Sequence, residues 1–386
     1  MILSLYAFSL ACFLLGIYPF TFYPLSLLVI RAAHKPIEPR IAENANPRPC
    51  ISIALCAYNE ERSIGAKIRN LATVSSAYPG ESEILIYLDA CTDRTADIVR
   101  TEAAAIGANF IVVEGTQRAG KSHGMSRLMA DATGDIVIFT DANVELDKNC
   151  LDVAARVFTD AGIGCICGNL LYLNASDSAT AEIGSLYWRF EEWLKEAESQ
   201  TGSTVGADGS LFAIRRALFR PVPDDIIDDM FTSMGVLLQG QRVIRRDDFR
   251  AYEMHTVASR DEFRRKVRIA CRSMNCYRLL VPHFRTLPLL TRYKIYAHKL
   301  LRWLTIYWLA VGVAALLCAL LLEGAILPAA ILAATGVALT AAAVLGVKSS
   351  ILEILRAFIA TGLGVAQSYR GERYQTWNIA SSSRLG

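Results

Sequence analysis

The chain lacks the spacings and charges that mark several common classes of protein. Its ten cysteines include no Cys-x-x-Cys pair, and no close cysteine and histidine have zinc-finger spacing. A structural zinc site of the usual kind is therefore excluded. The formal net charge is only +3, which lacks the strongly basic footprint of a nucleic-acid-binding domain. Internal repeats and low-complexity segments are also missing. We therefore expect no nucleic-acid partner, and a reducing, cytosolic environment for the polar part of the chain.

Charge is also missing from three long stretches, residues 1–30, 303–322 and 325–347. Each reaches the roughly 20 apolar residues that cross a bilayer. The mean hydropathy of +0.30 is high for a purely soluble protein. A cleaved signal peptide would have a basic start and a shorter apolar core. We therefore predict a retained N-terminal transmembrane anchor over 1–30 and a transmembrane hairpin in the C-terminal membrane region 286–386.

Basic residues flank these stretches on one side. Arg31, Lys35, Arg40 and Arg48 lie in or beside the linker 31–49, and Arg292, Lys294, Lys299 and Arg302 precede the hairpin. Basic flanks stay on the cytosolic side. We therefore predict a multi-pass protein of the cell (inner) membrane with its polar domain in the cytosol. Residues 351–368 carry an apolar stripe interrupted by charge, and both an interfacial helix and a third span fit them.

Residues 50–285 have the pattern of an α/β domain. Short apolar runs predict strands over 51–57, 83–88, 110–114 and 136–140, and helical segments separate them. Strands that alternate with helices indicate a mostly parallel sheet. Beyond Asp147 the pattern loosens, with strands expected over 163–173, 210–214 and 242–252 and helices over 179–199 and 261–277.

Polar residues follow several of these strands. Tyr58, Asn59 and Glu60 follow the first strand, Asp89 the second, and Asp141 and Asn143 the fourth. Ligands of open α/β sheets bind beyond the carboxyl ends of the strands. Two oxygen ligands two residues apart suit a hard cation that carries phosphates. The alternative is a strand that runs into an ordinary Asp/Asn turn.

A second motif competes for the same region. Gly115–Ser122 fits the Gly-x-x-x-x-Gly-Lys-Ser phosphate loop, follows a strand and precedes a helix. About 20 residues separate Lys121 from Asp141, which leaves room for only one helix. This alternative also gives Asp89 and Asp229 no function. Both interpretations place Lys121 beside a phosphate.

Taken in order, these motifs resemble the family 2 glycosyltransferases, which are membrane-attached inverting enzymes with a GT-A fold (Rossmann-like, mostly parallel sheet). The matching stretches are ISIALCAYNE at 51–60, LDACTDRT at 88–95, Gly120-Lys121, TDAN at 140–143, and GADGSLFAIRR at 206–216 with Asp228-Asp229. The resemblance covers about residues 50–280. It implies that Asp89 contacts the nucleotide base, that Lys121 lies near the diphosphate, and that the Asp141 and Asn143 motif binds metal.

The resemblance also implies an acceptor side. The loop with Asp208 and Gly209 would receive the acceptor, and Asp229 would be the general base, with Asp228 beside it. The chemistry agrees: Asp229 would take the proton of an acceptor hydroxyl, and Asp228 would raise its pKa by like-charge repulsion. Ordinary capping at a helix N-terminus is the alternative for both aspartates.

Two departures from the family pattern bear on the interpretation. Asn143 stands where the family usually has Asp and is a weaker metal ligand. Processive members carry Gln-x-x-Arg-Trp after the base, whereas this chain has Arg265 and Arg268 in a basic helix without the Trp. The two arginines would bind diphosphate or acceptor, or else anionic lipid.

Together these features predict a glycosyltransferase that moves sugar from a UDP-sugar to a lipid or growing glycan with Mg²⁺ or Mn²⁺ as cofactor. The donor would contact Tyr58, Asn59, Glu60, Asp89, Lys121 and Asp141. A membrane-tethered P-loop NTPase, a processive exopolysaccharide synthase and a non-catalytic scaffold remain as alternatives. The sequence leaves the oligomeric state open.

Overall fold

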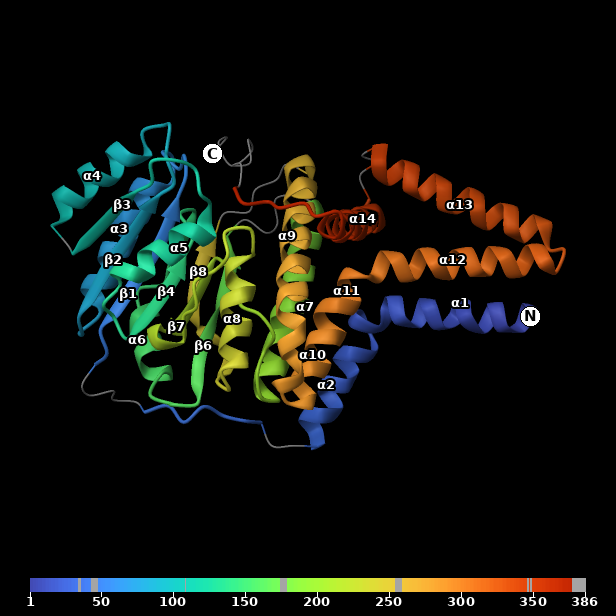
Figure 1. The fold of residues 1–386 in the computed structure, drawn as a ribbon, viewed down its shortest axis with the longest axis horizontal. Coiled ribbons are helices and arrows are strands. Elements are labelled where there is room, and N and C mark those ends of the chain that lie inside the picture. The colour runs from blue at the N-terminus through green and yellow to red at the C-terminus, as the bar shows by residue number, and fades with distance from the viewer. Residues whose placement is uncertain are drawn as a thin grey trace.

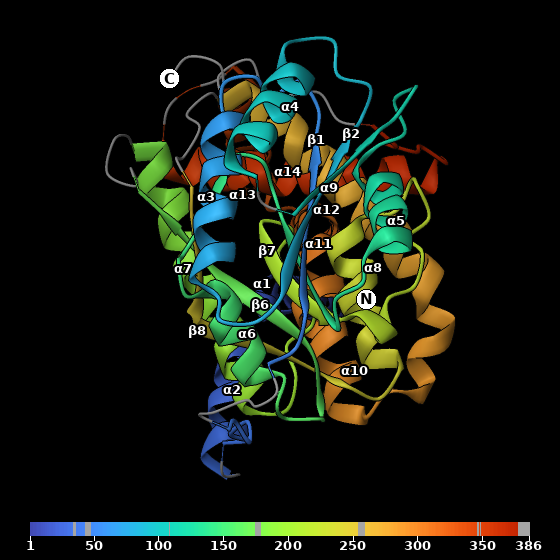
Figure 2. The same cartoon turned by 90° about the vertical axis from the view of Figure 1, so that its left-hand side faces the viewer.

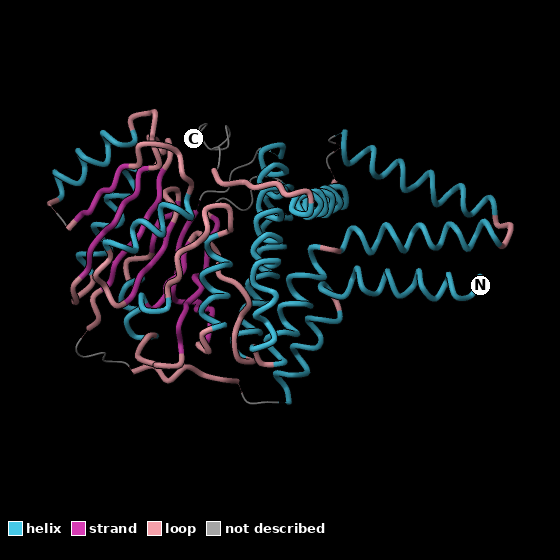
Figure 3. Tube along the Cα trace, viewed as in Figure 1, coloured by secondary structure: helices cyan, strands magenta, loops and turns pink. Residues whose placement is uncertain are grey.

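The computed structural model describes residues 1–33, 36–42, 48–107, 109–173, 179–253, 259–345, 347 and 349–376. An α/β unit forms one end of the molecule, and helices project from the other end (Figure 1). Every strand lies in the α/β unit, while the far end consists of helices and their connections (Figure 3). The N-terminal and C-terminal helices therefore meet on the same side of the α/β unit.

The sheet has eight strands in the order β3-β2-β1-β4-β7-β6-β8-β5. Their bounds are β1 Ile51–Ala57, β2 Ser82–Leu88, β3 Phe110–Glu114, β4 Ile136–Thr140, β5 Val144–Leu146, β6 Ile163–Tyr172, β7 Leu211–Arg215 and β8 Arg242–Glu253. β1 to β4 pair parallel with one another, as predicted. β7 and β5 pair antiparallel with their neighbours, so the sheet is mixed in its second half. The short strand β5 was not expected from the sequence.

Helices cover both faces of this sheet. One face packs against α3 (Ile64–Ala77), α4 (Thr95–Ile106) and α6 (Cys150–Val157). The other packs against α5 (Lys121–Asp131), α8 (Asp228–Leu238) and α9 (Ser259–Leu280). Figure 2 shows the sheet between α3 and α6 on one side and α5 and α8 on the other. Both faces of the central strands are buried, which explains their continuous apolar runs.

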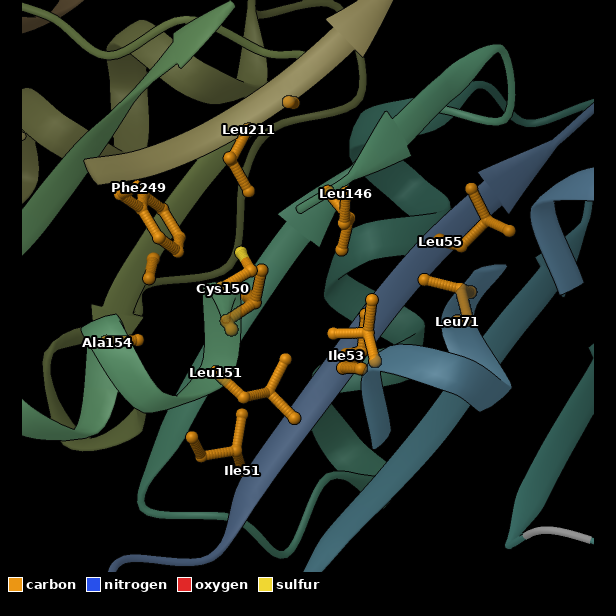
Figure 4. Packing of buried hydrophobic residues seen from close by; sticks show 14 of the residues in the cluster. Ile51, Ile53, Leu55, Leu71, Leu146, Cys150, Leu151, Ala154, Leu211 and Phe249 are labelled. Atoms are coloured by element: carbon orange, nitrogen blue, oxygen red, sulfur yellow. The ribbon is translucent and has the colours of Figure 1, made fainter. Parts of the chain in front are cut away.

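Apolar side chains of the first face fit closely together (Figure 4). Ile51, Ile53 and Leu55 alternate along β1 with residues that face the opposite core, and all three are fully buried. Leu71 of α3 and Leu151 of α6 pack beside them. This core fixes the direction of β1 and so the place where the strand ends.

Four helical segments are long and apolar enough to cross a membrane: Ile2–Phe20, Thr305–Leu322, Ile326–Ala343 and Ser350–Tyr369. They correspond to α1 (Ile2–Ile17) with its 3₁₀ extension Tyr18–Phe20, α12 (Thr305–Leu322), α13 (Ile326–Leu345) and α14 (Ser350–Tyr369). α1, α12 and α13 run in the plane of Figure 1, whereas α14 is seen end-on. α14 packs against α9, one helix of the α/β unit. α14 therefore runs across the direction of the other three helices, and both its interfacial and its spanning interpretation stay predictions.

The predicted anchor 1–30 is two helices rather than one. The chain turns at Pro19, and α2 (Phe22–Ala33) then leaves the direction of α1 (Figure 1). Tyr23 and Leu27 of α2 pack against Leu194 and Ala197 of α7 (Ala179–Gln200). Proline disrupts a continuous helix because it lacks the amide proton. Only the first helix and its 3₁₀ turn therefore form the candidate span.

The segment before α12 joins the membrane helices to the α/β unit. It consists of the 3₁₀ segment Val281–Thr286, α10 (Leu289–Lys294), a π-helical stretch Ile295–Leu300 and α11 (Leu301–Trp303). Ile295 and Ala297 of the π-helical stretch are buried. This junction therefore packs against the rest of the protein and is not a free linker.

Candidate active site

Lys121, the first residue of α5, lies at the centre of a group of carboxylates. Its Nζ lies 2.6 Å from Asp141 Oδ1 at the end of β4 and 3.3 Å from Asp228 Oδ2 in the first turn of α8. It also donates to the Gly209 carbonyl at 3.1 Å. Burial alone would lower the pKa of Lys121, but Asp141 and Asp228 outweigh it and hold this pKa well above its usual value. Lys121 is therefore a fixed positive charge at the strand ends.

Asp229 follows Asp228 in the same helical turn but has a different environment. Burial first, and then the charges of Asp228 and Asp208, raise the pKa of Asp229 to about 7, while Lys121 opposes the shift. In contrast, Lys121 and Arg272 hold the pKa of Asp228 below its ordinary value although burial opposes them. The helix N-cap is Ile227, so neither aspartate is the capping residue. One carboxylate is thus held ionised and its neighbour is placed to accept a proton near neutral pH.

Gly209 allows the loop after α7 to approach this pair. A Cβ atom at Gly209 would lie 3.1 Å from Asp229 Oδ2 and 3.3 Å from Lys121 Nζ. Asp208, one residue earlier, accepts the amide proton of Ser210 at 3.0 Å and so forms a tight turn. The predicted acceptor residues Asp208 and Gly209 therefore do lie beside the predicted base.

Asp89 is fully buried at the end of β2 and is bound to the neighbouring loop. Its carboxylate accepts the amide protons of Ala119 at 2.7 Å and Gly120 at 3.1 Å. Two amides of the Gly115–Ser122 motif are thus used inside the protein rather than presented to a phosphate. This geometry disfavours the phosphate-loop alternative. Asp89 therefore fixes the conformation of the loop that precedes α5.

The turn after β1 faces the same loop. The Arg118 guanidinium lies 3.5 Å from the centre of the Tyr58 ring, a cation–π contact. Asn59 has a φ of 54° and accepts the amide proton of Thr92 at 2.8 Å. Glu60 accepts a hydrogen bond from Ser63 at 2.8 Å, and α3 begins at Ile64. Tyr58 and Arg118 therefore form a flat surface, whereas Asn59 and Glu60 organise the turns around it.

The segment that follows α14 also reaches this loop. Gln375 Nε2 donates to the Ala119 carbonyl at 3.3 Å, and the Gln375 carbonyl lies against Gly120. Gly120 has a φ of 91°, and a Cβ there would come within 2.2 Å of that carbonyl. Glycine at this position satisfies both the backbone conformation and the close approach.

Asn143 bonds to Glu253, a residue that lies outside every sequence motif considered above. Asn143 Nδ2 donates to Glu253 Oε1 at 2.7 Å, and β5 and β8 place Val144 opposite Glu253. Burial first, and then the charge of Asp141, raise the pKa of Glu253 to about 7. Glu253 thus lies at one edge of the site, held by the hydrogen bond from Asn143 and within reach of the charge of Asp141. Among the residues that the structure describes, no three His, Cys, Asp or Glu side chains form a complete metal cage.

The two arginines of α9 differ from each other. Arg265 is paired with Glu262 at 2.8 Å and is more than half exposed. Arg268 is half-buried, and burial together with Arg272 and Arg265 lowers its pKa to about 10. A partly buried guanidinium between two others is a position where an anion would be bound.

The sequence and the fold of this domain are similar to those of known proteins. Residues 52–222 match the model of glycosyl transferase family 2. An N-acetylglucosaminyltransferase from Rhizobium meliloti is 24% identical over 54% of this chain and 51% of its own length. An undecaprenyl-phosphate 4-deoxy-4-formamido-L-arabinose transferase from Pseudomonas fluorescens is 26% identical over 34% of this chain and 38% of its own length. The chain thus spans about half the length of the first of these curated relatives and less of the second.

Within this chain, residues 52–222 are thus similar in sequence to family 2 glycosyl transferases. A mannosyltransferase from Pyrobaculum calidifontis, solved in complex with GDP-Man and Mn²⁺, superposes with a TM-score of 0.72 at 23% identity. The superposition covers 96% of this chain and all of that one. The fold is therefore GT-A, as the sequence predicted.

A Gly209→Ala substitution tests the close approach of the 201–209 loop to the paired aspartates. We expect a roughly tenfold or larger fall in the rate of sugar transfer, because sub-ångström displacement of reacting groups costs up to about 10²-fold. Gly235→Ala in α8 is the matched control, since a Cβ there meets nothing within 4 Å. Equal transfer rates for both variants, measured with radiolabelled donor, would contradict the role given to Gly209.

Proposed function

We propose that this glycosyltransferase transfers a sugar from a UDP-sugar to a lipid or growing glycan at the cytosolic face of the cell membrane, with inversion at the anomeric carbon. The observation that carries this proposal is the position of Lys121 between Asp141 and Asp228, with Asp229 and Gly209 adjacent. A cation and a base meet at one end of the sheet there. Transfer of a sugar from a diphosphate needs both.

The donor side has a place for each part of a nucleotide sugar. The Tyr58 ring and Arg118, at the end of the loop held by Asp89, would receive the nucleobase. Lys121 and Arg268 supply positive charge for the diphosphate. When the diphosphate departs, negative charge develops on it, and preorganised cations stabilise that charge.

The oxygen ligands at the edge of the site fit Mg²⁺ or Mn²⁺. Asp141 and the Asn143–Glu253 pair would hold the ion, and the diphosphate would complete its coordination. A divalent ion bound there would neutralise the leaving diphosphate. Glu253 would supply the carboxylate that is missing from the Asp-x-Asp pattern because Asn stands at position 143.

The acceptor side is formed by Asp208, Gly209 and Asp229. Asp229 would take the proton of the acceptor hydroxyl as its oxygen attacks the anomeric carbon from the face opposite the diphosphate. Asp228 keeps Lys121 in place and raises the pKa of Asp229. The acceptor would approach from the membrane helices, since α1, α12 and α14 lie on this side of the α/β unit (Figure 1).

A panel of nucleotide sugars tests the proposal. The full chain in detergent micelles is incubated with UDP-glucose, UDP-N-acetylglucosamine or GDP-mannose, with and without Mn²⁺. Undecaprenyl phosphate and dioleoylglycerol are the acceptor probes. We expect metal-dependent transfer from a UDP-sugar. Phosphate release from ATP or GTP without sugar transfer would instead support the NTPase alternative, and long polymer products would support a processive synthase.

A Glu253→Gln substitution tests the metal set separately from catalysis. We expect Mn²⁺ affinity in the presence of UDP to fall about tenfold, the effect typical of losing a group that supports a metal ligand. Calorimetric titration of Mn²⁺ measures this without turnover. Glu145→Gln is the matched control, because Glu145 is an exposed acid on β5, opposite Tyr252 of β8. Unchanged Mn²⁺ affinity in Glu253→Gln would remove Glu253 from the site.

A further inference from the structure

Lys294, the last residue of α10, is only 1% exposed to solvent. It holds the start of the 201–209 loop. Its ammonium donates to the carbonyls of Glu198 at 2.8 Å, Thr201 at 3.2 Å and Ser203 at 3.0 Å. The first of these carbonyls belongs to the last turn of α7. Carbonyls at a helix C-terminus lack partners in the helix and favour a cation. Lys294 therefore ends α7 and shapes the turn that follows.

Glu198, also fully buried, binds the next part of the same loop. One carboxylate oxygen accepts hydrogen bonds from Thr204 Oγ1 at 2.8 Å and from the Val205 amide at 3.1 Å. Its other oxygen lies 2.7 Å from His298 Nδ1 in the π-helical stretch and accepts the Tyr23 hydroxyl of α2. Side chains of α2 and of the π-helical stretch therefore meet at the carboxylate that holds Thr204 and Val205.

The loop continues from this anchor to the paired aspartates. The Ala207 amide donates to Ser233 Oγ at 3.0 Å, and Ser233 Oγ donates to the Asp229 carbonyl at 2.7 Å. Gly206, with a φ of 111°, lies against the Lys299 side chain. Hydrogen bonds at both ends of the 201–209 loop, joined by the loop backbone, thus connect the segment before α12 to the helix that carries Asp229.

We propose that Lys294 is a positioning residue for the sugar acceptor: it fixes the 201–209 loop so that Asp208 and Gly209 stand beside Asp229. The proposal rests on the proposed function, in which this loop receives the acceptor. Because α10 leads through the π-helical stretch into α12, the helices at the membrane and the acceptor loop share one anchor. The recorded hydrogen bonds of Lys294 go to Glu198, Thr201 and Ser203 and not to the donor loop at 115–120, so we expect donor binding to depend on Lys294 less than acceptor binding does.

The test is a Lys294→Met variant of the full chain in micelles. We expect the KM for the acceptor probe, undecaprenyl phosphate or dioleoylglycerol, to rise about tenfold, since charge-assisted hydrogen bonds to the loop are lost. We expect the Kd for UDP to stay within about twofold of wild type. Amide hydrogen exchange should accelerate in residues 202–208 and remain unchanged in residues 115–120.

Two further variants keep the test decisive. Thr204→Val preserves shape and removes one hydrogen bond to Glu198, so it should change the same quantities in the same direction by less. Arg245→Met is the matched control: Arg245 is a buried cation that binds Glu192 and Glu196 of α7 without touching the loop. We expect no change of acceptor KM in Arg245→Met.

Unchanged amide exchange in residues 202–208 of Lys294→Met and Thr204→Val would overturn the proposal. Equal shifts of acceptor KM and UDP affinity would also overturn it, because they indicate a general loss of structure. If the wild-type chain transfers sugar to neither lipid, the lipid acceptor of the proposed function fails. The exchange of residues 202–208 would then still decide whether Lys294 holds the loop.

Discussion

Replacement of Asp229 by Asn is expected to abolish sugar transfer while UDP still binds. General-base catalysis contributes about 10²- to 10⁴-fold to a rate, and the amide cannot accept the acceptor proton. Asn has nearly the same shape, so the contact with Gly209 is preserved. The measurements are the transfer rate with radiolabelled donor and the Kd for UDP in the presence of Mn²⁺.

The pH dependence of the wild-type enzyme provides a second measure of Asp229. Its pKa is raised to about 7, so the carboxylate is protonated below that pH and is unavailable as a base. We therefore expect kcat/KM to fall as the pH falls through about 7, and to be level above it. Asp225→Asn is the matched control, because Asp225 pairs with Arg373. Wild-type turnover by Asp229→Asn, or a flat profile between about pH 5 and 8, would contradict the assignment.

The donor half of the site was predictable because it depends on short patterns. Apolar runs of β1, β2 and β4 end in Tyr58, Asp89 and Asp141, and parallel strands bring their carboxyl ends to one edge. The resemblance to a family added Asp228 and Asp229, whose local sequence alone fits any helix start. The structure places Lys121, Asp141, Gly209 and the two aspartates together, and the roles assigned to them stay predictions.

Contacts between segments far apart in the chain could not be predicted from the sequence. Glu253 meets Asn143 only because β5, a strand of three residues, pairs with the end of β8. A strand this short has no readable periodicity. From the sequence, Lys294 is one of the basic residues that precede a predicted membrane span. In the structure it is buried beneath the 201–209 loop. Burial of a charged side chain follows from tertiary partners, which local patterns do not contain.

The position of Asn143 also illustrates what geometry adds to a motif. From the sequence, an amide in place of Asp weakens the metal site. In the structure the amide nitrogen donates to Glu253, so a carboxylate is still held beside Asp141. An Asp at position 143 would bring a third negative charge to these two. The departure from the family pattern is therefore matched by a second residue rather than left uncompensated.

Lys121→Met is expected to have the second large effect, because Lys121 serves both halves of the site. Its ammonium contacts Asp141 and Asp228 and also lowers the pKa of Asp229. Without it, the three carboxylates lose their shared cation, so UDP affinity should fall by about tenfold or more. The pKa of Asp229 should rise, which shifts the acidic limb of kcat/KM to higher pH.

Asp228→Asn changes the same pKa in the opposite direction and so separates the two effects of Lys121. Removal of the Asp228 charge relieves the repulsion that raises the pKa of Asp229, so the acidic limb should move below about 7. Lys121 keeps Asp141 as a partner in this variant, so the loss of UDP affinity should be smaller than in Lys121→Met. If both variants shift the limb in the same direction, the carboxylate that titrates is not Asp229. The opposite shifts of the two profiles therefore identify the base by its charged neighbours, independently of the size of either rate.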